Sequence, residues 1–151
     1  MYLITKYDVA QKYAKGGRKL YQITIAKGKS SDEVAIPLAN IQQFVNQYVL
    51  TAKRKDVLGR MQQYARDGSN VNSQIFINIL INEDAIKSAN MPQLREFLIQ
   101  HGVDYQIVRH PFGWGDSTMV VLFKMDKIVQ AKVVTPQEKI TQFDLPSDFA
   151  S

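Results

Sequence analysis

The chain has 151 residues, a hydrophobic fraction of 45%, a charged fraction of 22% and a formal net charge of +5. These values are typical of a globular domain with a buried core and exclude a chain that is disordered throughout. The sequence has no cysteine, which excludes disulfides, thiolate metal sites and a cysteine nucleophile. No apolar run reaches the ~20 residues that span a bilayer, and no signal peptide is recognised, so we expect a cytoplasmic protein without membrane contact.

The first expected elements are β-strands. Residues 20–26 alternate between apolar and polar side chains and are rich in β-forming residues, with glycines on both sides. We expect residues 2–7 to supply the partner strand and residues 33–37 to form a short extended segment.

Two amphipathic helices are predicted next, because apolar residues recur at the spacing of one helical face. The first stripe consists of Ile41, Phe44, Val45, Tyr48 and Val49, and the second of Val57, Leu58, Met61, Tyr64 and Ala65. Thr51 is the expected N-cap between them, and Gly68 the expected stop.

Residues 73–82 are predicted to form a central β-strand, because four isoleucines alternate with Phe76, Asn78 and Leu80. Asn90 is then expected to cap a helix that has Pro92 in its first turn, and Gly102 is the expected C′ stop. His101 falls in the last turn of this helix, where a capping role is favoured over a catalytic one.

Three further strands are expected at residues 103–109, 118–124 and 127–134, the last two joined by a tight turn at Met125-Asp126. A short helix is expected to follow to residue 143. The predicted fold class is α+β, a mixed and mainly antiparallel sheet with about three helices packed on it. Residues 1–143 are predicted to form a single globular domain, and residues 144–151 a flexible tail.

The order of elements from residue 73 to 143 resembles the C-terminal half of thioredoxin-like proteins. Strand, helix ending at His101-Gly102, hairpin 119–124 with 127–129, and final helix follow one another as they do in that family. The family's two-cysteine motif is absent, and Asp116-Ser117-Thr118 stands where the family has a cis-proline. The resemblance therefore implies an alternative α/β topology and a scaffold without redox activity.

Positive charge is concentrated at the front of the chain. The first 67 residues carry twelve bases and five acids, whereas the remaining 84 have a net charge of −2, and four of the seven tyrosines lie among the early bases. Bases neutralise phosphates and tyrosine rings stack on nucleobases, so this half predicts a nucleic-acid-binding surface, with single-stranded DNA or RNA preferred. The candidate contacts are Lys12, Lys15, Arg18, Lys19, Tyr21, Lys27, Lys29, Lys53, Arg54 and Lys55. A solvated basic surface without a ligand explains the same pattern.

The loop between the strands predicted at residues 103–109 and 118–124 suggests an alternative function to nucleic-acid binding. It holds the only tryptophan, Trp114, between two glycines, with Arg109, His110 and Phe112 close by. Aromatic loop residues favour contact with a partner or ligand, which predicts a protein–protein interaction module, although a lid folded onto the sheet end explains the same residues. The tail 143–149 mixes acids with apolar residues and is a second candidate for partner contact.

A metal-dependent nuclease is the third reading, because Glu83 and Asp84 follow a predicted central strand and adjacent acids can bind Mg²⁺. No third carboxylate stands at a metal-binding spacing, and no phosphate loop, dinucleotide motif or serine-nucleophile elbow occurs. We therefore expect a non-enzymatic protein with no catalytic residue, no metal ligand and no cofactor.

Overall fold

The computed structural model describes residues 2–4, 20–65, 68–109 and 118–134, which belong to two compact units. The β unit is formed by Met1–Gly28 together with Tyr105–Ser151, and the helical unit by Lys29–Asp104. The helical unit is therefore inserted into the chain of the β unit. The expectation of one domain over residues 1–143 stays a prediction, and the helix and tail expected after residue 134 lie outside the described residues.

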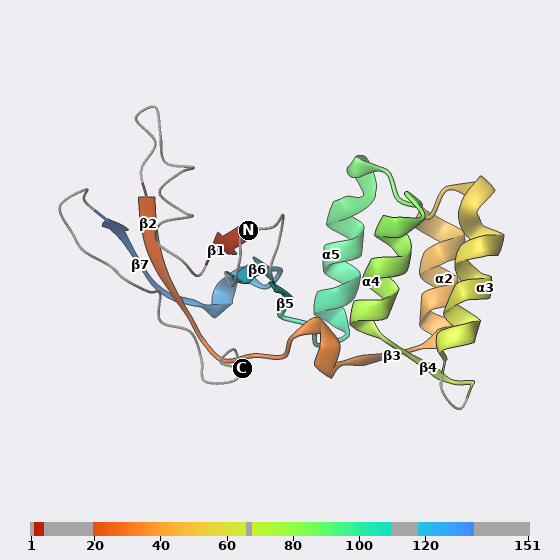
Figure 1. Ribbon diagram of the computed structural model, residues 1–151, viewed down its shortest axis with the longest axis horizontal. Coiled ribbons are helices and arrows are strands. Elements are labelled where there is room, and N and C mark those ends of the chain that lie inside the picture. The colour runs from red at the N-terminus through yellow and green to blue at the C-terminus, as the bar shows by residue number, and fades with distance from the viewer. Residues whose placement is uncertain (1, 5–19, 66–67, 110–117, 135–151) are drawn as a thin grey trace. The chain divides into compact units, whose positions relative to one another are not determined.

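The β unit contains one three-stranded sheet and one two-stranded ribbon (Figure 1). Its strands are β1 (Tyr2–Ile4), β2 (Leu20–Ile25), β5 (Tyr105–Arg109), β6 (Thr118–Leu122) and β7 (Ile128–Val134). In the sheet, β6 lies between β1 and β5; in the ribbon, β2 pairs with β7. Both are antiparallel, as the sequence predicted.

Sheet and ribbon share one apolar core. Leu3 and Ile107 both lie opposite Val120, so these three side chains share one face of the sheet. The buried members of the core are Ile25, Tyr105, Val120 and Leu122, and the partly buried members are Leu3, Ile23, Ile107 and Ile128. Every described strand of the β unit contributes to it, which explains how strands of three to seven residues are stabilised.

The helical unit consists of four α-helices with short connecting elements. In chain order these are η1 (Ser31–Glu33), β3 (Ala35–Pro37), α2 (Leu38–Tyr48), η2 (Thr51–Lys53), α3 (Arg54–Tyr64), β4 (Asn70–Asn72), α4 (Ser73–Asn82), η3 (Ser88–Asn90) and α5 (Met91–Gln100). Helix α3 packs on α2 and α4, and Phe97 of α5 contacts Phe44 of α2 and Phe76 of α4. Strands β3 and β4 form a small antiparallel ladder.

The predicted amphipathic helices are confirmed as α2 and α3. Ile41, Phe44 and Val45 of α2 are buried, as are Val57 and Met61 of α3, whereas Tyr64 at the end of α3 is 52% exposed and does not continue the second stripe. The prediction that Thr51 caps the second helix is wrong. Thr51 instead begins the 3-10 turn η2. The N-cap position of α3 is occupied by Lys53, whose side chain makes no capping hydrogen bond.

The prediction of a central strand at residues 73–82 is wrong, because this segment is helix α4. Asn72 caps it: its Oδ1 accepts hydrogen bonds from the backbone N–H groups of Gln74 and Ile75, at 2.9 and 3.4 Å. Phe76, Ile77 and Leu80 are buried, which is a helical spacing, whereas Ile81 is 57% exposed. The alternating isoleucines therefore do not define two faces of a sheet.

Two predicted strand pairings are also wrong. β1 pairs with β6 instead of β2, and β6 and β7 do not form a hairpin, because η5 (Met125–Lys127) separates them and β7 pairs with β2. The hairpin and strand that carried the thioredoxin-like resemblance are thus absent from the described part of the chain. The α+β class is confirmed, and the described part of the chain holds four α-helices where about three were expected. None of the described helices has the length and apolar character needed to cross a membrane.

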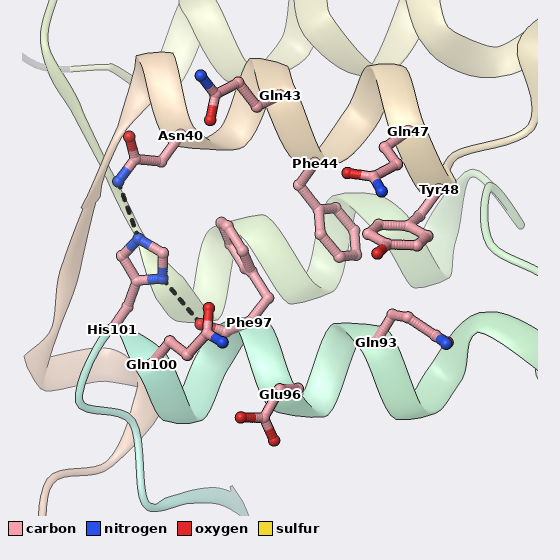
Figure 2. Close-up of a pocket in the computed structure, with 10 residues that line it drawn as sticks. All are labelled: Asn40, Gln43, Phe44, Gln47, Tyr48, Gln93, Glu96, Phe97, Gln100 and His101. Atoms are coloured by element: carbon pink, nitrogen blue, oxygen red, sulfur yellow. Dashed lines mark hydrogen bonds between the residues drawn. The ribbon is translucent and has the colours of Figure 1, made fainter.

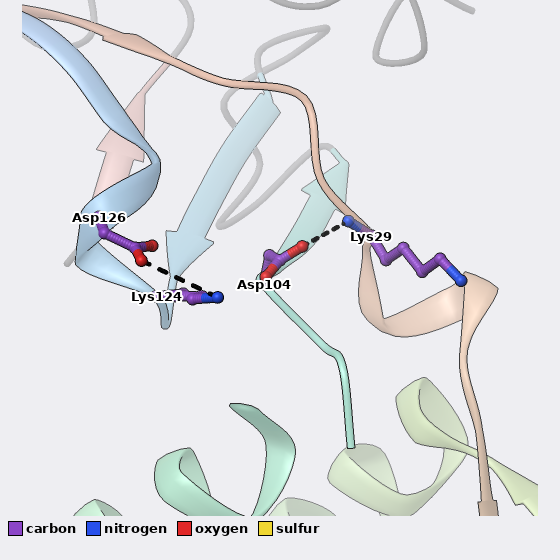
Figure 3. A network of polar contacts seen from close by, with 4 residues as sticks. All are labelled: Lys29, Asp104, Lys124 and Asp126. Atoms are coloured by element: carbon purple, nitrogen blue, oxygen red, sulfur yellow. Dashed lines mark hydrogen bonds and ion pairs between the residues drawn. The ribbon is translucent and has the colours of Figure 1, made fainter. Parts of the chain in front are cut away.

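The two ends of the helical unit are hydrogen-bonded to each other. The backbone N–H of Lys29 donates to Oδ2 of Asp104 at 2.8 Å, and the N–H of Asp104 donates to the Lys29 carbonyl at 2.9 Å (Figure 3). Within the β unit, the Tyr105 hydroxyl donates to the Gly28 carbonyl at 2.8 Å and accepts from the Gly28 N–H at 3.2 Å. The chain thus leaves the β unit and returns to it at adjacent, hydrogen-bonded positions.

Candidate functional site

The net charge of the protein divides by structural unit. The segments that form the β unit hold eleven bases and six acids, whereas those of the helical unit hold eight of each. The whole +5 therefore belongs to the β unit, and the helical unit is neutral. The sequence placed the boundary of the positive region at residue 67, because it could not show that residues 105–151 join residues 1–28 in one unit.

The described part of the β unit is strongly basic. It contains one acid, Asp126, against five bases: Lys27, Arg109, Lys124, Lys127 and Lys132. Arg109, Lys27 and Lys132 are exposed, while Lys124 and Lys127 are half-buried. Nζ of Lys124 lies 3.9 Å from Oδ2 of Asp126, a long and exposed ion pair that contributes little (Figure 3).

Three of these bases gather at one end of the ribbon, which we call the basic end: Lys27, Lys124 and Lys127. Ile25 lies opposite Ile128 in the β2–β7 register, and the Ala26 N–H donates to the Lys127 carbonyl at 2.6 Å. This bond holds the chain after β2 beside η5. Of the three bases, only Lys27 belonged to the candidate contacts, and the other two could be found only with the strand register known.

The ribbon also presents an aromatic ring and a further base. Tyr21 of β2 lies opposite Val133, and its side chain is 49% exposed. Lys132 lies opposite Gln22, on the other face from Tyr21, because directly paired residues share a face and neighbours alternate. Both faces of the ribbon thus carry a group that can contact a polyanion.

The remaining described candidates belong to the helical unit. Lys29 is exposed, as is Lys55, while Lys53 and Arg54 are partly buried at the start of α3. The Nε–H of Arg54 donates a hydrogen bond to the Val49 carbonyl at the end of α2, at 3.0 Å, so this side chain helps to hold α2 and α3 together. The candidate contacts are therefore divided between the two units.

Several candidates lie outside the described residues. These are Lys12, Lys15, Arg18 and Lys19 of the basic front, and His110, Phe112 and Trp114 of the loop. Arg109, the remaining loop candidate, ends β5 opposite Thr118 and is exposed. Contact through the loop or the 143–149 tail stays a prediction.

Glu83 and Asp84 lie in a turn that follows α4. Oε1 of Glu83 forms an ion pair with Nε of Arg60 at 3.0 Å, and Asp84 has a φ of 49°, a left-handed conformation that aspartate tolerates in turns. Among the residues described, no three of His, Cys, Asp and Glu are grouped closely enough to hold a metal ion. Glu83 therefore has a basic partner, and no described third ligand accompanies the pair.

A groove in the helical unit was not anticipated from the sequence. It has a volume of about 410 Å³ and lies between α2 and α5 (Figure 2). Its lining residues are Asn40, Gln43, Phe44, Gln47 and Tyr48 from α2, Gln93, Glu96, Phe97 and Gln100 from α5, and His101, which follows α5. The sequence does contain a signal for it, because amide residues recur beside the apolar stripe of each helix. Such residues indicate an ordinary solvent-exposed helix face unless the two helices are known to be neighbours.

His101 closes one end of this groove with both ring nitrogens engaged. Its Nδ1 lies 2.8 Å from the Phe97 carbonyl, and its Nε2 lies 3.0 Å from Nδ2 of Asn40 (Figure 2). A backbone carbonyl only accepts, so Nδ1 donates to the Phe97 carbonyl, while Nε2 is paired with the Asn40 amide. The expected position at the end of the helix is confirmed, since His101 follows the last residue of α5.

Comparison of the chain with protein-family models, curated proteins and solved structures finds no match.

Proposed function

We propose that the β unit binds nucleic acid without catalysing a reaction on it, with single strands of DNA or RNA preferred over duplex. The observation that carries this proposal is the division of charge, +5 on the β unit and zero on the helical unit. Clustered like charge costs self-repulsion, and a polyanion relieves it.

Counterion release would supply most of the binding free energy. Each phosphate neutralised by a lysine or arginine releases a condensed cation, which favours binding without regard to sequence. The basic end and Lys132 offer four bases along one ribbon. This arrangement supports recognition of a backbone by its charge.

The preference for single strands rests on Tyr21. Its half-exposed ring stands on a strand, where a base that is not paired in a duplex can stack on it. Stacking on an aromatic side chain contributes about 1–3 kcal/mol per base. A duplex offers its phosphates to the same lysines but keeps its bases stacked on one another.

Charge-matched variants test this proposal by fluorescence anisotropy with labelled single-stranded DNA, RNA and duplex. Lys27→Gln/Lys132→Gln removes two exposed charges from the β unit and should weaken binding about tenfold or more at low salt. Lys87→Gln/Arg95→Gln removes two exposed charges from the helical unit and should change the affinity less than about twofold. Equal losses in the two variants would show that net charge alone governs binding, which contradicts an interface on the β unit.

Two further variants refine the interface. Tyr21→Leu should weaken binding to single strands and leave duplex binding nearly unchanged, because only the former offers a free base face. Lys53→Gln/Lys55→Gln tests whether the helical unit takes part, as the sequence suggested. A loss comparable to that of Lys27→Gln/Lys132→Gln would extend the interface to α3.

A further inference from the structure

The groove between α2 and α5 is bordered by two rows of polar side chains, all carboxamides except Glu96. Gln43 and Gln47 follow Asn40 at i+3 and i+7 on α2, and α5 repeats this spacing with Gln93, Glu96 and Gln100. Seven residues at 1.5 Å per residue give each row a length of about 10 Å. The four glutamines are exposed.

The two rows run in opposite directions. Asn40, near the start of α2, bonds to His101 at the end of α5, and Asn90, just before α5, donates from Nδ2 to the Tyr48 carbonyl at 3.3 Å. The ends of the rows therefore correspond: Asn40 and Gln100 lie toward one end of the groove, and Gln47 and Gln93 toward the other (Figure 2). A ligand lying along the groove meets carboxamides on both sides.

The floor consists of aromatic rings that pack on one another. The Phe44 ring lies 4.7 Å from Phe97 and 5.1 Å from Tyr48, and Phe97 lies 4.4 Å from His101, measured between ring centroids. Phe44 is 3% exposed. Because these rings cover one another, the floor offers few open ring faces on which a sugar or a nucleobase could stack.

The charge of the groove also narrows the choice of ligand. Glu96 is its one carboxylate, and no lysine or arginine lines it. Both ring nitrogens of His101 are engaged within the helical unit, by the Phe97 carbonyl and the Asn40 side-chain amide. The lining therefore supplies no lysine or arginine to neutralise a phosphate, which distinguishes the groove from the basic surface of the β unit.

We propose that this groove binds an extended peptide segment of a partner protein, uncharged or basic in sequence. A carboxamide has one acceptor and two donor hydrogens, the same groups that a peptide backbone presents, so each can pair with a main-chain N–H and C=O. An extended chain rises about 3.3 Å per residue, and about three residues fit within the length of the rows. A helical ligand would leave the carboxamides without partners, because its own backbone groups are already bonded and it needs an apolar groove.

Selection from a displayed library of random twelve-residue peptides on the full-length protein tests this inference. We expect enriched peptides that lack acidic residues at their centre. For a synthetic copy of an enriched peptide, Gln43→Ala/Gln93→Ala should weaken binding about tenfold or more, since two main-chain hydrogen bonds are lost. Gln62→Ala/Gln63→Ala, two exposed glutamines of α3 outside the groove, should change the affinity less than about twofold.

Two readouts separate backbone recognition from other binding. Methylation of the central peptide nitrogens should abolish binding, and the side-chain amide NMR signals of Gln43, Gln47, Gln93 and Gln100 should shift on titration. The inference is overturned if no peptide is enriched, if enriched peptides bind both double variants equally, or if N-methylation has no effect. Shifts of these signals by a single-stranded oligonucleotide or an oligosaccharide, in place of a peptide, would also overturn it. The peptide outcomes are independent of the β unit, whose proposal is tested by its own variants.

Discussion

The buried hydroxyl of Tyr105 gives a sharp test of how the β unit is held together. Tyr105 is 1% exposed, and its hydroxyl makes two hydrogen bonds to one residue, donating to the Gly28 carbonyl and accepting from the Gly28 N–H. Tyr105→Phe removes the hydroxyl and leaves both backbone groups without this partner. Each such bond contributes about 0.5–1.5 kcal/mol, so the free energy of unfolding should fall by about 1–3 kcal/mol.

Urea denaturation followed by circular dichroism measures this loss. With an m-value of about 2 kcal/mol/M, the midpoint for the β unit should fall by about 0.5–1.5 M. Tyr21→Phe, in the same unit, is the matched control, because its side chain is 49% exposed and water can replace its hydroxyl. Its effect should stay within about 0.5 kcal/mol. A Tyr105→Phe change as small as that of the control would refute the structural role of this hydroxyl.

Four further outcomes are expected. A fragment of residues 29–104 should fold by itself, with helical circular dichroism and a cooperative melt, because its ends are hydrogen-bonded to each other; a fragment without a melt would contradict this. Asn72→Ala should cost about 1 kcal/mol through loss of the α4 cap, measured in urea, and an unchanged midpoint would argue against the cap. Gly59→Ala should raise the stability by about 0.5–1 kcal/mol, because this glycine lies inside α3 and an added Cβ would meet no atom within 4 Å; a loss of stability would contradict this. Gly102→Ala should lower it by about 1 kcal/mol, because φ is 88° there, and a neutral result would mean that the backbone relaxes.

The sequence predicted helices best where the apolar stripe was interrupted by polar residues at regular intervals. Helix α2 is such a case, since the buried residues Ile41, Phe44 and Val45 recur at helical spacing with polar residues between Ile41 and Phe44. Helix α5 was predicted together with its end, because Pro92 and Gly102 mark the two boundaries. In both helices, local pattern and tertiary packing agree.

Helix α4 was predicted as a strand because its apolar residues fit both the two-residue period of a strand and the 3.6-residue period of a helix. Four isoleucines alternate as they would in a strand, yet Phe76, Ile77 and Leu80 also share one helical face. Isoleucine favours strands, and short apolar runs do not distinguish the two structures. The Asn72 cap and the packing of α4 against α3 and α5 determine the outcome.

Strand pairing and the candidate site were harder to predict, because both depend on which distant segments meet. The bases of the basic end come from residues 27 and 124–127, which are joined only through the β2–β7 register. The groove likewise needs α2 and α5, more than 40 residues apart, to become neighbours. The sequence composition shows the excess of positive charge, but the fold is needed to assign that charge to the β unit.

The salt dependence of binding to single-stranded DNA tests the central claim most directly. With the full-length chain and a labelled oligonucleotide of about 20 nucleotides, log K should fall linearly with log[salt]. Three to five phosphate contacts, the number that the described bases of the β unit could make, predict a slope of about −2 to −4, at about −0.7 per contact. Absence of binding at about 50 mM salt, or a slope near zero, would contradict nucleic-acid binding by the β unit.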